Sequence, residues 1–242
     1  FGRMPRSMRG AAGRIAQSLP VSTSNISFDY KAKQFVKGMD YDRFARHFVW
    51  IGSIPPSEQP SLLTPDFAPE SDDIVLEDVR RHAANCNPRD EFDLLSYLYA
   101  KIYMCDDILT KVDRASMMNS LEARAPFLDH RVVEFLTSLP TRQKLRWFTM
   151  KYIMKKSFHG RLPKEILYRK KKGFGVPVAD WLKGELRPWV EELLSPSSLA
   201  IHGVFEPSAV QRLWAEHTAG LKDNRKALWS LVVLLLWLRE NF

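Results

Sequence analysis

Four consecutive cations, Arg169 to Lys172, are the residues of this chain with the clearest capacity for chemistry. A turn-forming sequence follows them at once, Gly173 to Pro177, in which Phe174 stands between two glycines. A run of like charges is most often a solvated surface. Lysines held on a short structured loop, however, also suit the negative charge of a phosphate or pyrophosphate leaving group. We expect burial of the neighbours on both sides, Leu162-Pro163, Ile166-Leu167 and Trp181-Leu182, and hence a loop that holds one lysine in place while the others reach solvent.

A second segment, Asp106 to Asp129, places many charges within a run that favours a helix. In a helix over residues 107–120, Asp107 and Lys111 stand one turn apart and can form an ion pair. We expect most of this segment to be buried. The helix face expected to meet the core carries Ile108, Val112, Ala115 and Met118.

The remaining charges of this segment admit two interpretations, a structural one and a chemical one. For Asp113, Arg114, Glu122 and Arg124 we favour an internal ion-pair network that orients two helices, because such networks are a common alternative to active sites. For the pair Asp107 and Lys111, a structural role and a place in a substrate pocket are evenly balanced. Asp129 is placed to cap a further helix that begins at His130.

Composition limits the classes of protein to which the chain can belong. With 242 residues, 45% of them hydrophobic, it can bury a substantial core, and its net charge of +8 suits an anionic partner such as a nucleotide, a nucleic acid or a membrane surface. Cys86 and Cys105 lack a metal-binding or redox spacing, which fits a reducing cytoplasm. The six histidines form no HxxxH or HExxH pair, so they do not favour a metal site. The longest apolar run, 227–238, is too short to cross a membrane, which needs roughly 20 residues.

The spacing of apolar residues predicts a chain that is mostly helical. Five prolines between residues 53 and 71 predict a surface connection, which we take as the best candidate for an internal boundary or a mobile loop. Helices are expected over residues 6–18, 28–36, 41–51 and 72–86, around 92–102, and near 107–120, 130–138, 150–159, 186–194, 207–217 and 225–240.

The two charged segments together resemble the synthetase domain of the glutamine-hydrolysing asparagine synthetases. Residues 107–130 follow the family pattern D-x-L-x-K-x-D-R-x-S-M-x-x-S-L-E-x-R-x-P-F-L-D-H, and Arg169, Lys171 and Phe174 follow its R-x-K-x-x-F pattern. The resemblance implies that Lys171 takes part in adenylation chemistry as the catalytic residue of this chain. It also implies that Asp107 and Lys111 bind substrate, with a spacing that differs by one residue from better-known relatives.

The resemblance covers the C-terminal part of that synthetase domain. It implies a fold that is mainly α in the residues present, the C-terminal helical portion of an α/β PP-loop ATP pyrophosphatase domain of the adenine nucleotide α-hydrolase-like kind. Residues 1–242 form that portion, with 1–85 as a variable helical stretch and 86–242 as the family-like core. The glutaminase domain and the Ser-Gly-Gly-x-Asp-Ser pyrophosphate loop do not occur in the sequence. We expect both to lie upstream of Phe1 in a longer cytoplasmic parent protein.

The resemblance further implies an ATP-dependent ligase that adenylates the side-chain carboxylate of aspartate and amidates it with glutamine-derived ammonia to give asparagine. ATP and Mg²⁺ are then bound mainly by residues outside this chain, the glutaminase domain of the same parent chain is a partner, and this part alone is inactive. Two alternatives stay open: amidation of a different carboxylate, and a non-catalytic basic helical module that binds RNA or a partner subunit. Binding of nucleic acid is not favoured, because no aromatic side chains that could stack on bases are interleaved with the basic run. Binding to a membrane is not favoured either. A homodimer stays open.

Overall fold

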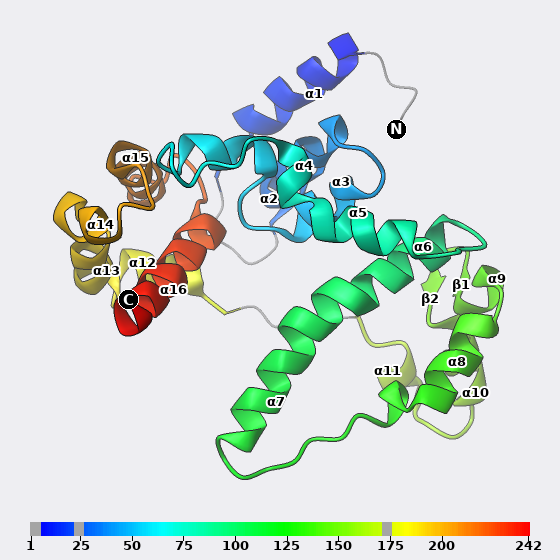
Figure 1. Ribbon diagram of the computed structural model, residues 1–242. Helices are drawn as coiled ribbons and strands as arrows, with labels where there is room; N and C mark the ends of the chain where they lie inside the picture. Colours follow the sequence, from blue (N-terminus) through cyan, green and yellow to red (C-terminus); the bar gives the residue numbers. More distant parts are fainter. Residues whose placement is uncertain (1–5, 22–26, 171–175) are drawn as a thin grey trace. The chain divides into compact units, whose positions relative to one another are not determined.

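The computed structural model describes residues 6–21, 27–170 and 176–242 and is mainly helical (Figure 1), as the sequence predicts. The chain divides into two compact units. The first comprises residues 1–77 and 174–242, and the second comprises residues 78–173. Within the described residues, the strands are β1 (Leu145–Arg146) and β2 (Thr149–Met150), which pair antiparallel in a short hairpin of the second unit.

The first unit is built from helices of the two ends of the chain. Its N-terminal elements are α1 (Arg6–Ser18), α2 (Phe28–Lys37), the 3-10 turn η1 (Gly38–Asp40), α3 (Ala45–Ile51), the 3-10 turn η2 (Pro56–Ser61) and α4 (Asp72–Val75). Its C-terminal elements are α12 (Val178–Lys183), α13 (Arg187–Leu193), α14 (Pro196–His202), α15 (Pro207–Thr218) and α16 (Arg225–Asn241). The predicted helices at 6–18, 186–194, 207–217 and 225–240 are thereby confirmed.

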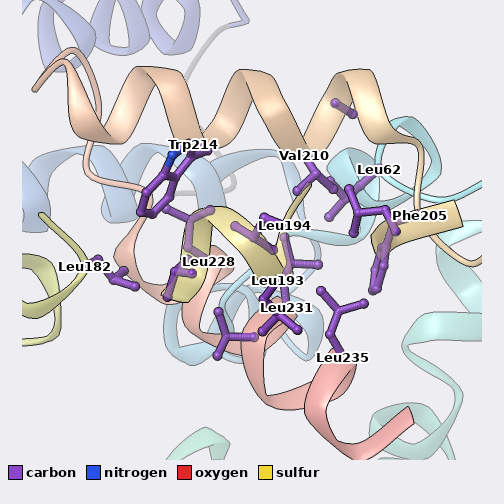
Figure 2. Packing of buried hydrophobic residues seen from close by; sticks show 14 residues of the cluster. Leu62, Leu182, Leu193, Leu194, Phe205, Val210, Trp214, Leu228, Leu231 and Leu235 are labelled. Atoms are coloured by element: carbon purple, nitrogen blue, oxygen red, sulfur yellow. The ribbon is translucent and has the colours of Figure 1, made fainter. Parts of the chain in front are cut away.

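The core of the first unit lies among its C-terminal helices. Figure 2 shows Val210 and Trp214 pointing from α15 towards Leu194 and Leu228, which are fully buried. The apolar run of α16 contributes Leu228, Val232 and Leu235 to this cluster, at the i, i+4, i+7 spacing of one helix face. The interpretation of this run as a buried core helix is therefore confirmed for one face only, because Val233 and Trp237 are each 51% exposed.

The prediction that the proline-rich segment 53–71 is a surface connection is confirmed only in part, because residues 57–58, 60–61 and 65–67 are exposed while the core holds other parts of the segment. Leu62, which follows η2, is 5% exposed and belongs to the core cluster. Thr64 fixes the segment further, because its backbone N–H donates to the Val204 carbonyl at 3.0 Å and its hydroxyl donates to the Gly203 carbonyl at 2.7 Å. The prolines shape a connection that the core holds in place, and the unit boundary falls after it, between Glu77 and Asp78.

A close approach of backbone and side chain joins α2 to α3. At Gly38, which follows α2, a Cβ atom would lie 2.1 Å from Nε1 of Trp50, so only glycine leaves room for the indole. Trp50 also stacks on Phe35 at a centroid distance of 5.8 Å. Arg46 closes the turn by donating from Nε to the Gly38 carbonyl at 3.0 Å.

The second unit contains one long helical run and several short elements. The run comprises α6 (Glu91–Leu98), the π-helix η3 (Tyr99–Leu109) and α7 (Thr110–Met117), which follow one another without a break (Figure 1). The other elements are α5 (Glu77–Ala84), the 3-10 turn η4 (Pro126–Leu128), α8 (His130–Ser138), α9 (Thr141–Lys144), the hairpin, α10 (Tyr152–Ser157) and α11 (Lys164–Leu167). The helix expected over 72–86 is interrupted at Leu76, where α4 ends and α5 follows.

An ion-pair cluster connects the start of α6 to the end of α8 and to α9. The Asp93 carboxylate accepts hydrogen bonds from Lys144 Nζ at 2.6 Å and from Arg89 Nε at 2.7 Å. The Arg89 guanidinium also donates to carbonyls at the end of α8, those of Thr137, Ser138 and Leu139. These bonds join residues about fifty positions apart and satisfy carbonyls that a helix end leaves free.

Candidate functional site

Asp107 and Lys111 lie at the point where the π-helix η3 passes into α7. The predicted ion pair is confirmed, with Lys111 Nζ 3.6 Å from Asp107 Oδ1. Both side chains remain accessible, at 63% exposure for Lys111 and 52% for Asp107. The Thr110 hydroxyl donates to the Cys105 carbonyl, five residues back, at 2.8 Å. Long π-helical runs are rare and π-turns are frequent at functional sites, a signal that periodicity in the sequence does not contain.

The expectation that the segment 106–129 is mostly buried is wrong. On the face predicted to meet the core, Val112 is 45% exposed and Met118 is 86% exposed, and Leu121 and Phe127 further along are 63% and 60% exposed. The periodicity correctly predicts an apolar helix face. Periodicity does not show, however, which other surface would cover this face. No described part of the second unit covers it.

The charges of this segment do not form the internal network that we expected. Glu122 and Arg124 pair with each other, with Arg124 Nε 2.8 Å from Glu122 Oε1, but both are exposed and only two residues apart. Within the described residues no ion pair involves Asp113 or Arg114. The network that joins helices is instead the cluster of Arg89, Asp93 and Lys144, which sequence reasoning missed because its members are distant in the chain.

The turn that ends the segment is formed as predicted. Asp129 caps α8, with its Oδ1 accepting from the Arg131 backbone N–H at 2.9 Å, and the helix begins at His130. The Arg131 guanidinium also donates to both carboxylate oxygens. These hydrogen bonds from Arg131 hold the pKa of Asp129 below its usual range.

Lys171, the predicted catalytic residue, lies outside the described residues, as do Lys172 to Gly175. Before it, Arg169 and Lys170 are exposed. Tyr168 ends α11 by donating its backbone N–H to the Lys164 carbonyl at 2.9 Å, and the Lys155 ammonium lies 5.6 Å from the centre of its ring. The cation run therefore starts from a defined helix end.

The apolar neighbours of the cation run differ from expectation. Leu162 and Ile166 are 42% and 59% exposed, so the prediction of burial on this side is wrong. Beyond the run, Leu182 is fully buried, whereas Trp181 is 36% exposed. Short helices such as α11 have too few turns to bury an apolar face by themselves, which the pattern of residue types does not reveal.

The described residues contain no cluster of three or more His, Cys, Asp or Glu side chains placed to hold a metal ion, so they do not by themselves fit Mg²⁺. Among the described helices, none combines the length and the apolar character required to cross a lipid bilayer.

Comparison with known proteins identifies the family. The family model described as asparagine synthase matches residues 6–239. Asparagine synthetase [glutamine-hydrolyzing] 1 of Bacillus subtilis is 33% identical over 147 residues, which cover 61% of this chain and 23% of the relative. A putative asparagine synthetase [glutamine-hydrolyzing] of Mycobacterium bovis is 31% identical over 98% of this chain and 35% of its own length.

A third relative has a different name, the amidase chyE of Penicillium rubens, which is 30% identical over 48% of this chain and 18% of its own length. No solved structure gives a significant match. The chain spans about a third or less of the length of these curated relatives. Because the family model covers nearly the whole sequence, the chain belongs to the asparagine synthase family.

Proposed function

We propose that this chain is part of an ATP-dependent ligase that converts the side-chain carboxylate of aspartate into an amide, giving asparagine. The observation that carries the proposal is the family match over residues 6–239, which includes both charged segments. The similarity to the asparagine synthetases of Bacillus subtilis and Mycobacterium bovis supports the same reaction class. The two cysteines, both free, fit a cytoplasmic enzyme.

The proposed reaction has two steps. An oxygen of the aspartate side-chain carboxylate attacks the α-phosphorus of ATP, which forms β-aspartyl-AMP and releases pyrophosphate. Ammonia then attacks the activated carbonyl carbon, AMP departs with the oxygen that joined it to the acyl group, and asparagine remains after loss of a proton. Glutamine supplies the ammonia through a glutaminase domain of the parent chain.

Lys171 is proposed to act in the first step. Negative charge builds on the phosphoryl oxygens as the carboxylate attacks, so a positioned ammonium stabilises the transition state more than the ground state. Removal of one such donor typically reduces the rate about 10²–10³-fold. The neighbouring Lys170 is exposed and serves as its natural control.

Asp107 and Lys111 are proposed to bind the amino acid substrate. Their opposite charges, held one turn apart and accessible to solvent, match the ammonium and carboxylate groups of an amino acid. Lys111 then contacts a substrate carboxylate and Asp107 the substrate ammonium. ATP and Mg²⁺ are proposed to bind mainly through residues outside this chain, and no step above depends on the metal.

A second candidate function is amidation of a different carboxylate. It is favoured by the similarity to a relative whose name is amidase rather than asparagine synthetase. The two candidates share the adenylation step and differ in the acid that triggers it.

The proposal is tested by pyrophosphate release from ATP by the gene product, measured with and without aspartate and then with a panel of other carboxylic acids. Aspartate-dependent release supports asparagine synthesis, and release with another acid alone supports the second candidate. If no acid triggers release of pyrophosphate, the ligase is refuted and the basic run Arg169 to Lys172 becomes a binding surface. Loss of RNA binding on replacement of all four cations would then assign it.

A further inference from the structure

A charged cavity of about 250 Å³ lies within the first unit. Its walls come from α2, the segment 53–62, α15 and the turn that leads into α16. A cavity of this volume can hold an ion or a small molecule.

The lining of this cavity has an excess of two positive charges. Five cations contribute to it, against three carboxylates. The cations are Lys37, Arg212, Lys222, Arg225 and Lys226, and the carboxylates are Glu58, Glu216 and Asp223.

Each carboxylate is already paired with one of the cations. Lys37 Nζ lies 3.2 Å from Glu58, Lys222 Nζ lies 2.8 Å from Glu216, and Arg225 lies 2.6 Å from Asp223. Burial raises the pKa of Glu216, but hydrogen bonds from Lys222 and Asn224 and the charges of Lys222 and Arg212 outweigh this effect and lower it. The three carboxylates are therefore ionised and form ion pairs with cations of the lining.

Arg212 and Lys226 carry the excess charge. No carboxylate of the described residues lies within ion-pair distance of either side chain. Lys226 Nζ instead donates to the Ile51 carbonyl at 3.3 Å and lies 5.7 Å from the centre of the Tyr30 ring, which fixes its position at the cavity wall. Arg212 extends from α15 one turn before Glu216, whose pKa its charge helps to lower, and among the described residues no hydrogen bond engages the donors of its guanidinium.

We propose that this cavity binds a small dianion, a phosphate or a dicarboxylate, between Arg212 and Lys226. Neither cation has a carboxylate of the described residues within ion-pair distance, so together they complement two negative charges, and a guanidinium can bind either a phosphate or a carboxylate in a bidentate manner. Among the uncharged polar side chains of the lining, Ser53 accepts from the Ser230 hydroxyl at 2.9 Å and keeps its own O–H for such a ligand. Gln34 and Ser61 already donate to the carbonyls of Trp50 and Glu58. The proposal is independent of the ligase reaction.

The test is isothermal titration calorimetry of the gene product with inorganic phosphate, succinate and acetate. We expect phosphate or succinate to bind saturably and acetate, which carries one charge, to bind at least tenfold more weakly, on the order expected for loss of one charge-assisted contact. The tighter of the two dianions identifies the class of ligand.

Variants assign this binding to the cavity. The double variant Arg212→Gln/Lys226→Gln is expected to lose at least about tenfold in affinity for the dianion. The matched control is Lys31→Gln, an exposed cation of α2 outside the cavity lining, which is expected to bind like the parent. The measured quantity is the difference in dianion affinity between the variants and the parent. Dianions that bind elsewhere on the protein bind to all of them alike and do not change this difference.

Removing the Lys226 ammonium from the Tyr30 ring could disturb the fold of the double variant. The single variant Arg212→Gln replaces an exposed side chain, so it tests the same site without that risk. It is expected to weaken binding in the same direction. Affinity that is unchanged in both variants, or reduced equally by Lys31→Gln, overturns the proposal, as does the absence of saturable dianion binding.

Discussion

Replacement of Asp93 by Asn is expected to weaken the connection between α6, α8 and α9. The Asp93 and Lys144 side chains are 14% and 17% exposed, and their hydrogen bond is 2.6 Å long. Hydrogen bonds to charged groups contribute about 1.5–3 kcal/mol each. Asn retains one acceptor oxygen for either Lys144 or Arg89 and removes the charge, so we expect a loss of about 2 kcal/mol, or about 30-fold in the local opening equilibrium.

Amide hydrogen exchange of the gene product measures this loss locally. In Asp93→Asn, protection in α6 and α8 is expected to fall about 30-fold. The control is Glu122→Gln in the exposed Glu122–Arg124 pair, which is expected to change protection less than about twofold. Equal effects of the two substitutions would refute the view that the cluster, rather than the charges of 106–129, joins the helices.

The pH dependence of amide protection provides a second test of the contribution that Asp93 makes to local stability. Burial raises the pKa of Asp93, but the hydrogen bonds and charges of Lys144 and Arg89 outweigh it and lower the pKa below its ordinary value of 3.8. The contribution is therefore complete above pH 3.8 and is lost as the pH falls through the pKa of the folded protein. Protection in the parent and in Asp93→Asn is expected to converge in acid.

Three further substitutions test separate parts of the structure. Gly38→Ala is expected to destabilise the protein by about 1–3 kcal/mol in urea unfolding, and to cost less in a Trp50→Leu background that removes the clash. Burial lowers the pKa of His217, so as the pH falls the unfolded chain takes up a proton near pH 6.5, before the folded protein does. The urea midpoint of unfolding is therefore expected to fall as the pH drops below 6.5. This fall is expected to be smaller in His217→Leu. Lys111→Met is expected to raise the KM for aspartate about tenfold or more, whereas Asp113→Asn, on the same exposed helix, is expected to leave it unchanged.

The sequence predicted most of the longer helices, because apolar periodicity is a local property, but it did not predict the short helices α9, α11, α12 and α14. Residues 130–138 and 207–217 fold as helices within a residue of the expected limits. The cap of α8 by Asp129 and the pairing of Asp107 with Lys111 were also predictable, since both depend on neighbours in the chain.

Contacts between distant residues were not predictable in this way. The pairing of Asp93 with Lys144 joins positions 51 residues apart, and the burial of Leu62 depends on helices more than a hundred residues later. The apolar face of α7 was identified correctly, but its exposure depends on which surfaces are available to cover it. The role of Lys171 stays a prediction from the resemblance, since this residue lies outside the described residues.

The most direct test of the ligase is the fate of ¹⁸O from the side-chain carboxylate of aspartate. If that carboxylate attacks the α-phosphorus, one labelled oxygen is transferred to AMP in the gene product's reaction with ATP and ammonia, and the transfer falls about 10²–10³-fold in Lys171→Ala but not in Lys170→Ala. Unlabelled AMP would contradict adenylation of aspartate. So would labelled inorganic phosphate formed with ADP, because the carboxylate would then have attacked the γ-phosphorus.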